Sequence, residues 1–504
     1  MQEKPTLKLK ATPAMRAGAK KTKRKGARRG AKPHQKQPFG TNSASQYNSQ
    51  NSRQDRQAED AAGKTETVNK AELDSRSAAF HILNAIINHH KTLDAAMAQQ
   101  PALAKLENRD RAFCRLLVSS CLRHYGQIGK ILSDRLDHTT PEPVRLAIVI
   151  GACQLLFLNI SAHAAVNTTV ELVRALEFPR QAGLANAVMR ELGRRMTRIQ
   201  NITDPIDNIP ETFQKRWRAA YGDEAVRKIA ELVSRRAPLD ITARHSPAEL
   251  ARTLKSEQIG KQTVRCHHSG DIVTMPGFEA GDWWVQDIAA ALPAQLMGNV
   301  AGKNIFDICA APGGKTAQLV AAGAQVTAID NDQDRLDRLS ENLTRLNMTA
   351  RIICSDVLSD TFADALSGNM ADGILLDAPC SATGTIRRRP DLLIRKADLD
   401  ITELAKIQAQ MVEACLAHLK PQGVMVYATC SLQPEEGEHI AAEMLSRHKD
   451  RLAAYPFEQD ELGVFASALT DEGWARILPS CLCDASTPHK DGNDGFFIAR
   501  FRRL

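Results

Sequence analysis

Apolar residues between about residue 66 and residue 200 recur at every third or fourth position. Ala79, Leu83 and Ile86 show this spacing, which is typical of the buried face of an amphipathic helix. A longer apolar helix is expected over residues 144–158, after a proline-containing break. The pattern therefore predicts an all-helical domain over residues 66–200.

From about residue 300 the pattern changes to short apolar runs that alternate with helical segments. Strands are expected over residues 304–308, 325–329, 350–354, 373–376 and 423–427, and helices over residues 316–322 and 333–346. Short strands joined by helices are typical of a doubly wound parallel sheet. The pattern therefore predicts a Rossmann-like α/β domain over residues 296–504.

Residues 201–295 have a mixed pattern. A strand is expected over residues 238–244, and the next segment begins with Ser246 and Pro247, a typical N-cap and first residue of a helix. Trp283 and Trp284 precede an apolar segment that predicts a helix leading into the last domain. We expect a small α/β module here.

Positive charge is concentrated at the N-terminus. Residues 1–37 contain 13 Lys and Arg and one acid, a net charge of +12, so the other residues carry −4 of the chain's total of +8. Residues 1–65 have few apolar groups, which predicts a disordered basic tail. Such a tail is attracted to the phosphates of nucleic acid; the alternative is a solubilising or targeting tail.

The remaining composition indicates an ordinary intracellular protein. No run of eighteen apolar residues predicts a membrane span, and the N-terminus does not resemble a secretory signal. The 11 scattered cysteines favour reduced thiols over disulfides. We expect a cytoplasmic protein with no metal site and no membrane partner.

The sequence FDICAAPGGKTAQL, residues 306–319, follows the first expected strand of the α/β domain. Gly313 and Gly314 let the backbone approach a ligand, and the helix that follows offers free N–H groups. Asp330 ends the second strand, where an acid can bind ribose hydroxyls, and Asp356 follows the third. Together these features predict an adenosyl cofactor; the alternative is a structural turn with surface acids.

Two cysteines lie just after expected strands. Cys380 belongs to the sequence DAPCS, which begins with Asp377, and Cys430 belongs to the sequence ATCS. The carboxyl ends of parallel strands meet at the edge of the sheet where ligands bind. We therefore expect both thiols and Asp377 at one site.

Paired thiols beside an acid fit methylation of a cytosine at C5. That carbon is a weak nucleophile, and a thiolate that adds to C6 makes it reactive. Asp377 is the candidate that engages the N3/N4 edge of the base, and a second thiol could help to release the enzyme. The motifs leave open which cysteine attacks. The alternative, a packed core cysteine, fits Cys354 or Cys415 better.

The run RRRP, residues 387–390, comes shortly after Cys380. Arginines beside a site for a polyanion contact phosphates, and we prefer this interpretation to a solvated face.

These motifs together resemble the RsmB/NOP (Nol1/Nop2/Sun) family of RNA cytosine-C5 methyltransferases. The sequences RDRAFCRLL, GACQLLFL, HAAVNTTVELV and NAVMREL resemble the NusB fold, and RILPS and DGFFIARF resemble the last motif of the family. The resemblance covers roughly residues 70–504. It implies a NusB-like RNA-binding domain, an RNA-recognition module and a methyltransferase domain.

The resemblance also assigns roles to the candidate residues. Cys430 is implied as the nucleophile and Cys380 as the thiol that assists release. The residues implied to contact S-adenosylmethionine are Cys309, Ala310, Ala311, Pro312, Gly313, Gly314, Lys315, Asp330, Asp356 and Asp377.

The NusB-like domain favours 16S rRNA as the substrate, and we expect a monomer. The alternatives are the same chemistry on tRNA or 23S rRNA, a catalytically inactive RNA-binding factor, and a protein methyltransferase, which would need no second thiol.

Overall fold

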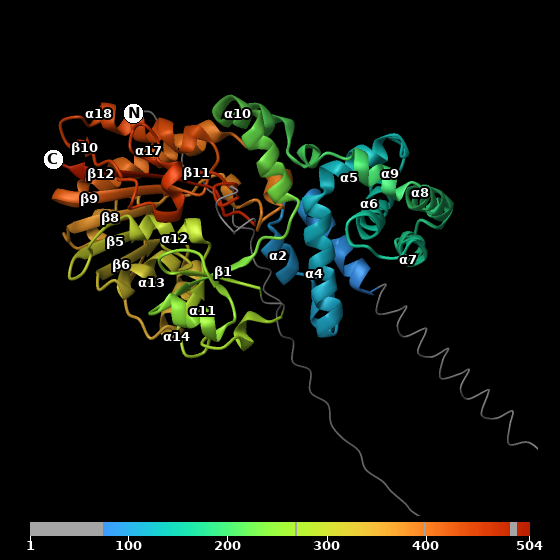
Figure 1. Cartoon of the computed structure of the whole chain (residues 1–504), viewed down its shortest axis with the longest axis horizontal. Coiled ribbons are helices and arrows are strands. Elements are labelled where there is room, and N and C mark those ends of the chain that lie inside the picture. Colours follow the sequence, from blue (N-terminus) through green and yellow to red (C-terminus); the bar gives the residue numbers. More distant parts are fainter. Residues whose placement is uncertain (1–73, 268–269, 398, 484–490) are drawn as a thin grey trace, which may run out of the picture. The chain divides into compact units, whose positions relative to one another are not determined.

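The computed structural model describes residues 74–267, 270–397, 399–483 and 491–504 (Figure 1). The expected basic tail lies outside the described residues. The first described region is all helical, as predicted. Its helices are residues 74–87, α2 (Leu93–Ala98), α3 (Pro101–Lys105), α4 (Asn108–Arg123), α5 (Tyr125–Ser133), α6 (Glu142–Leu156), α7 (Ala162–Ala175), η1 (Pro179–Gln181), α8 (Ala182–Arg194) and α9 (Met196–Ile202).

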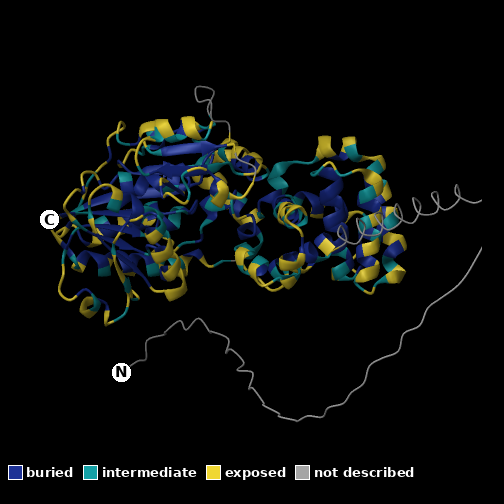
Figure 2. Ribbon diagram, turned by 90° about the horizontal axis from the view of Figure 1, so that it is seen from below, coloured by how far each residue is buried: buried dark blue, intermediate teal, exposed yellow. Residues whose placement is uncertain are grey.

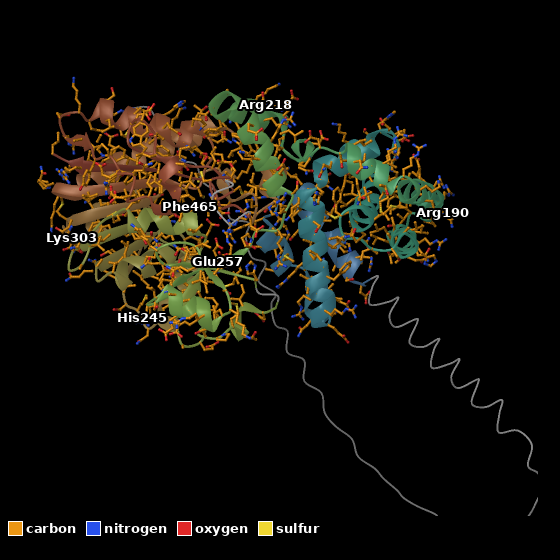
Figure 3. All side chains as sticks on the ribbon, in the orientation of Figure 1. Arg190, Arg218, His245, Glu257, Lys303 and Phe465 are labelled. Atoms are coloured by element: carbon orange, nitrogen blue, oxygen red, sulfur yellow. The ribbon has the colours of Figure 1, made fainter. Side chains whose placement is uncertain are left out.

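The helical region encloses an apolar core. Leu117 of α4 and Ile148 of α6 are fully buried in it, together with Cys121 and Cys153. These thiols serve as small core residues. Buried residues lie on the inner sides of the helices in Figure 2, and Figure 3 shows Arg190 of α8 at the surface.

After a short turn, η2 (Pro205–Asn208), a long helix, α10 (Glu211–Val233), leads out of this region. It changes direction at Gly222, whose φ of 82° lies in the left-handed region that glycine adopts readily. Trp217 of α10 is buried in one cluster with Leu392 and Leu432 of the last domain. This helix therefore shares a core with the α/β domain, although its sequence lies in the segment predicted as the small module.

The small module is a four-stranded antiparallel sheet in the order β2-β3-β1-β4. Its elements are β1 (Leu239–Ala243), α11 (Pro247–Thr253), β2 (Glu257–Gln258), β3 (Thr263–Cys266), η3 (Ile272–Thr274) and β4 (Trp283–Val285). The expected N-cap is confirmed, because Ser246 Oγ accepts a hydrogen bond from the Glu249 N–H. The helix expected after the tryptophans is α12 (Ile288–Gln295), and Asp287 is its N-cap.

The last domain is built on an eight-stranded sheet in the order β10-β12-β9-β8-β5-β6-β7, with β11 paired to β12. The strands are β5 (Asn304–Ile308), β6 (Gln325–Asp330), β7 (Arg351–Cys354), β8 (Ala371–Asp377), β9 (Leu419–Thr429), β10 (Leu452–Ala454), β11 (Ala475–Ile477) and β12 (Phe496–Arg503). The adjacent strands β9, β8, β5, β6 and β7 are parallel to one another. The five strands expected from the sequence are all present.

The sheet is parallel, as expected, except at one end. Strand β12 runs antiparallel to β9, β10 and β11. A parallel neighbour needs a crossover connection, usually a helix, and the chain reaches β12 from β11 without one. The fold class itself, a helical domain followed by a Rossmann-like domain, is confirmed.

Helices cover both faces of this sheet (Figure 1). Residues of α12 and α13 (Gly314–Ala321) are buried on one face, and residues of α17 (Ile401–Ala417) and α18 (Glu438–Arg447) on the other. The remaining helical elements are α14 (Gln333–Arg345), α15 (Phe362–Ala365), η4 (Thr383–Thr385), α16 (Leu392–Arg395), η5 (Pro434–Glu436) and η6 (Gly463–Ala468). Among the described helices, none combines the length and apolarity needed to cross a bilayer.

Candidate active site

The glycine loop, residues 309–315, connects β5 to α13. Gly313 has a φ of +100°, and a Cβ there would lie 2.9 Å from the side chain of Leu339. Glycine is therefore required for both the conformation and the space. Helix α13 begins at Gly314, two residues earlier than expected, so its free N–H groups lie in the loop itself.

A cavity of about 410 Å³ lies against this loop. It is lined by every residue of the loop, by Asp307 and Asp377 at the ends of β5 and β8, and by Phe278, Trp284, Val285, Gln286, Ala290, Asn342, Arg345 and Leu346. Eight of the ten residues implied to contact the cofactor are thus at one cavity. Asp330 and Asp356 are not among its lining residues.

Lys315 and Asp377 form an ion pair inside this cavity. Lys315 Nζ lies 2.8 Å from Asp377 Oδ2, and the two side chains are 11% and 29% exposed. Burial alone would lower the pKa of Lys315, but the neighbouring Asp377 carboxylate raises it above its ordinary value. Asp307 and the Cys430 thiolate act in the same direction. The ammonium of Lys315 therefore connects the glycine loop electrostatically to the cysteines.

Asp307 is a cavity residue that sequence analysis missed. Its Oδ2 accepts a 2.6 Å hydrogen bond from Thr316 Oγ1, whereas its buried Oδ1 has no hydrogen-bond partner among the described residues. Burial raises the pKa of Asp307 to about 7, against the hydrogen bond from Thr316 and the charge of Lys315. The signal was present in the sequence, since Asp307 immediately precedes the loop within a buried strand.

Asp330 and Asp356 occupy different environments. Asp330 is buried beneath the glycine loop, where its Oδ2 accepts a hydrogen bond from the Ala311 N–H and its Oδ1 lies 3.2 Å from Arg335. Asp356 is exposed, and its Oδ1 accepts a hydrogen bond from the Leu358 N–H. Asp330 thus supports the loop from below, while Asp356 lies at the surface after β7.

The two candidate thiols lie side by side. Strands β8 and β9 pair in parallel with Asp377 opposite Ala428, and the cysteines follow them. The Sγ atoms of Cys380 and Cys430 are 3.5 Å apart. The hydrogen bond between the thiols, and then burial, raise the pKa of Cys380 well above its ordinary value. Ionisation of the Cys380 thiol is therefore disfavoured.

The cysteine loops, residues 378–384 and 429–433, are also bonded to each other. The Gly384 N–H donates to the Cys430 carbonyl over 2.9 Å, and the Leu432 N–H donates to Thr383 Oγ1 over 2.9 Å. A Cβ at Gly384 would lie 2.0 Å from the Gly495 carbonyl oxygen, so only glycine fits there. The closeness of the two thiols thus depends on contacts between segments about 50 residues apart.

The interpretation of RRRP as a phosphate-binding run is wrong for its first two arginines. Arg387 is 1% exposed. Arg388 donates to Asp287 Oδ2 over 2.7 Å and to Asp494 Oδ2 over 3.1 Å. The Arg388 side chain is 26% exposed, but both carboxylates engage it, so it connects three segments of the protein and is not free to bind a polyanion. Arg389 is exposed.

The other cysteines divide between core and surface. Cys415 is buried, as expected, but Cys354 is exposed, so its assignment as a core residue is wrong. Strand β7 is the outermost strand on its side of the sheet, which explains the exposure of its end. Burial raises the pKa of Cys309 well above its ordinary value, so the thiol of the glycine loop is a poor nucleophile.

Comparison with known proteins agrees with this geometry. Residues 294–502 match the family described as 16S rRNA methyltransferase RsmB/F, and residues 73–194 match the NusB family. Ribosomal RNA small subunit methyltransferase B from Vibrio vulnificus is 35% identical over 395 residues, covering 74% of this chain and 91% of the relative. The chain belongs to the RsmB/F methyltransferase family. The resemblance found in the sequence is therefore confirmed.

A second relative agrees with this assignment to the RsmB/F family, and a solved structure shares the fold. The protein of the same name from Erwinia tasmaniensis is 32% identical over 450 residues, covering 84% of this chain and 97% of the relative. The crystal structure of PH0851 superimposes with a TM-score of 0.63 at 21% identity, covering 84% of this chain and 98% of that one. The structural match supports the fold.

Proposed function

We propose that this RsmB/F family member methylates C5 of a cytosine in 16S rRNA, with S-adenosylmethionine as the methyl donor and Cys430 as the nucleophile. The observation that carries the proposal is the pair of thiols 3.5 Å apart at the edge of the sheet where the cavity lies. A methyltransferase that acts on a more reactive atom needs no such pair, whereas attack at C6 and later release of the base give each thiol a task.

The cavity residues fit an adenosyl cofactor. A volume of about 410 Å³ lies within the usual range for small-molecule sites. The free Oδ1 of Asp307 and the Asp377 carboxylate suit positive groups, such as an amino group or a sulfonium. Lys315 and the N-terminus of α13 suit a carboxylate. When bound, the cofactor would supply the methyl group.

Attack and release can be divided between the thiols. Cys430 as thiolate would add to C6, and C5 would then take the methyl group. The first cause of the raised pKa of Cys380 is its hydrogen bond with Cys430. That cause disappears once the sulfur of Cys430 is bonded to carbon. Cys380 could then lose its proton to solvent and accept the C5 proton, while the bond from Cys430 Sγ to C6 breaks and restores the aromatic ring.

Asp377 and Lys315 would act on the opposite edge of the base. Asp377 lies three residues before Cys380 and lines the cavity, so its carboxylate can accept a hydrogen bond from the N4 amino group. The Lys315 ammonium, 2.8 Å from Asp377, would offset negative charge that develops on the ring during attack.

The RNA substrate is proposed from the family and from exposed charge. Arg218 of α10 is exposed, as Figure 3 shows, and the basic tail adds further charge that can neutralise phosphates. The relatives are named for the small ribosomal subunit, which favours 16S rRNA over 23S rRNA or tRNA. A ribosomal substrate also fits the cytoplasmic location expected from the sequence.

Bisulfite sequencing of total RNA from a deletion strain tests the function. We expect one cytosine in 16S rRNA to lose protection from conversion and to regain it when the gene is restored. A lost site in tRNA or 23S rRNA would instead support the same chemistry on that RNA. Unchanged RNA, together with no binding of S-adenosylmethionine in a calorimetric titration, would support an inactive RNA-binding factor.

A further inference from the structure

A buried carboxylate lies between the two cysteine loops. Glu436 ends the short turn η5, just after the cysteine loop that contains Cys430, and it is fully buried (0% exposed). No role was assigned to Glu436 from the sequence. A buried carboxylate is costly unless hydrogen bonds replace its water, so its partners reveal why it is there.

Four donors surround this carboxylate. Oε1 accepts from the Ser381 N–H over 2.8 Å and from Gln408 Nε2 over 3.0 Å. Oε2 accepts hydrogen bonds from the hydroxyls of Ser381 and Ser431, each at a distance of 2.5 Å. An ionised carboxylate is purely an acceptor, and hydrogen bonds to a charged oxygen are the shorter and stronger kind.

The donors come from the residues that follow the two thiols. Ser381 is next to Cys380 and Ser431 is next to Cys430, and the two serine Oγ atoms are 3.0 Å apart. Gln408 of α17 also donates to the Pro379 carbonyl over 2.9 Å, on the other side of Cys380. One carboxylate is therefore bonded to the residue that follows each thiol, to the backbone and hydroxyl of Ser381 and to the hydroxyl of Ser431.

We propose that Glu436 is the positioning residue that aligns Cys380 and Cys430 as a working pair. Its importance for the reaction rests on the function proposed above, since attack and release must reach the same base from two loops. Displacements of about 1 Å in such arrangements can cost a hundredfold in rate. The alignment itself is a property of the protein without RNA and can be measured separately.

The informative variant is Glu436→Gln, which keeps the size of the side chain and removes an acceptor. One carboxylate oxygen becomes an NH2 group and the negative charge is lost, so the donors of the cysteine loops lose their charged acceptor and the serine hydroxyls must reorient. The matched control is Glu435→Gln, the same change one residue earlier. Melting temperatures of both variants show whether measurements are made on folded protein.

Closure of a disulfide between Cys380 and Cys430 reports their alignment. Diamide takes the two thiol hydrogens, becomes a hydrazine and leaves the sulfurs bonded; peptide mapping by mass spectrometry follows the linked peptides over time. We expect rapid closure in the wild-type chain and in Glu435→Gln, and closure slowed by about tenfold or more in Glu436→Gln. A folded Glu436→Gln protein with the wild-type rate would overturn the proposal, even if its melting temperature is lower.

Single serine variants decide the matter if Glu436→Gln does not fold. Ser381→Ala and Ser431→Ala each remove one hydroxyl donor and leave the carboxylate its other bonds. We expect closure slowed by about threefold in each, as for a hydrogen bond of modest net strength. Wild-type closure in both would also overturn the proposal.

Assays with RNA separate this proposal from the function on which it rests. In Glu436→Gln we expect a larger share of the protein in a denaturant-resistant adduct with RNA than in the wild type, because a misaligned Cys380 releases the base slowly. If the wild-type chain methylates no RNA, the proposed function fails, while the disulfide measurements still decide whether Glu436 aligns the thiols. Methylation by Glu436→Gln at the wild-type rate, without extra adduct, would count against the positioning role.

Discussion

The cysteine loops and the glycine-loop cavity lie at the same edge of the sheet, but the buried carboxylate in each has a different set of hydrogen bonds. Between the cysteine loops, Glu436 has two donors on each oxygen. In the cavity, Asp307 has one oxygen with a donor and one without a partner among the described residues, and its pKa is raised to about 7. A carboxylate with all its bonds made fixes geometry, whereas one with a free oxygen can bind a ligand group.

The difference suggests a division of labour. In the proposed mechanism the cysteine loops hold two sulfurs at a set distance through attack and release, so fixed hydrogen bonds suit them. The cavity would exchange a charged cofactor at every turnover, so its polar atoms keep unused hydrogen-bonding capacity until the cofactor binds. Predictions that alter one region and spare the other test this comparison.

The largest effect is expected from Cys430→Ala. Loss of the proposed nucleophile should lower methyl transfer by more than about 1,000-fold, while binding of S-adenosylmethionine changes little because Cys430 is not among the residues that line the cavity. Transfer of labelled methyl groups to RNA measures the first effect and calorimetry the second. Cys354→Ser, at an exposed thiol, is the control and should retain wild-type activity.

Cys380→Ala should block release more than attack. We expect a protein–RNA adduct that survives denaturation and accumulates to a level well above that of the wild type, seen as a shifted band of labelled RNA on a denaturing gel. If Cys430→Ala traps RNA and Cys380→Ala does not, the two thiols have the reverse roles.

Lys315→Met should weaken cofactor binding by about 10-fold to 100-fold, as for the loss of a charged hydrogen bond. The change also leaves Asp377 without the ammonium 2.8 Å away. Calorimetric titration with S-adenosylmethionine measures the loss. Lys303→Met is the control, because Lys303 is exposed and directly precedes β5, at the end of the strand away from the glycine loop (Figure 3). Equal weakening of cofactor binding in both variants would contradict a cavity role for Lys315.

The smallest effect is a pH-dependent change in stability at Asp307. Its folded pKa of about 7 exceeds the ordinary value, so its neutral form is favoured in the folded protein. The stability that it contributes is complete below about pH 4 and is lost as the pH rises through about 7. Asp307→Asn stays neutral, so its melting temperature should rise relative to wild type by a few degrees between pH 5 and pH 8.5. Asp337→Asn, at an exposed carboxylate, should show no such trend.

Much of the fold could be predicted because local patterns carry it. The five expected strands of the last domain have the correct positions, because the sequence of a parallel strand is a short run of apolar residues. The antiparallel end of the sheet was missed. Strand β12 is paired with β9 and β11, and pairing between distant segments leaves no local signature.

The site was predicted only where its chemistry lies in one continuous motif. The glycine loop and the two cysteines were found, because strand ends meet at one edge of a parallel sheet. Glu436 and the ion pairs of Arg388 were missed. Both depend on partners far away in sequence, such as Ser381 for Glu436 and Asp494 for Arg388, and each charged residue alone resembles a solvated one.

The sequence by itself determined the class of this protein: a helical domain, a small module, and a Rossmann-like domain with two thiols and a glycine loop. Periodicity and motif order suffice for this, because they reflect local backbone geometry and strand direction. Only the tertiary structure decided that the thiols lie 3.5 Å apart, that a buried carboxylate joins their loops, and that Arg388 is an internal ion-pair partner. Burial and long-range hydrogen bonds set the position of these groups, and both arise when distant segments pack together.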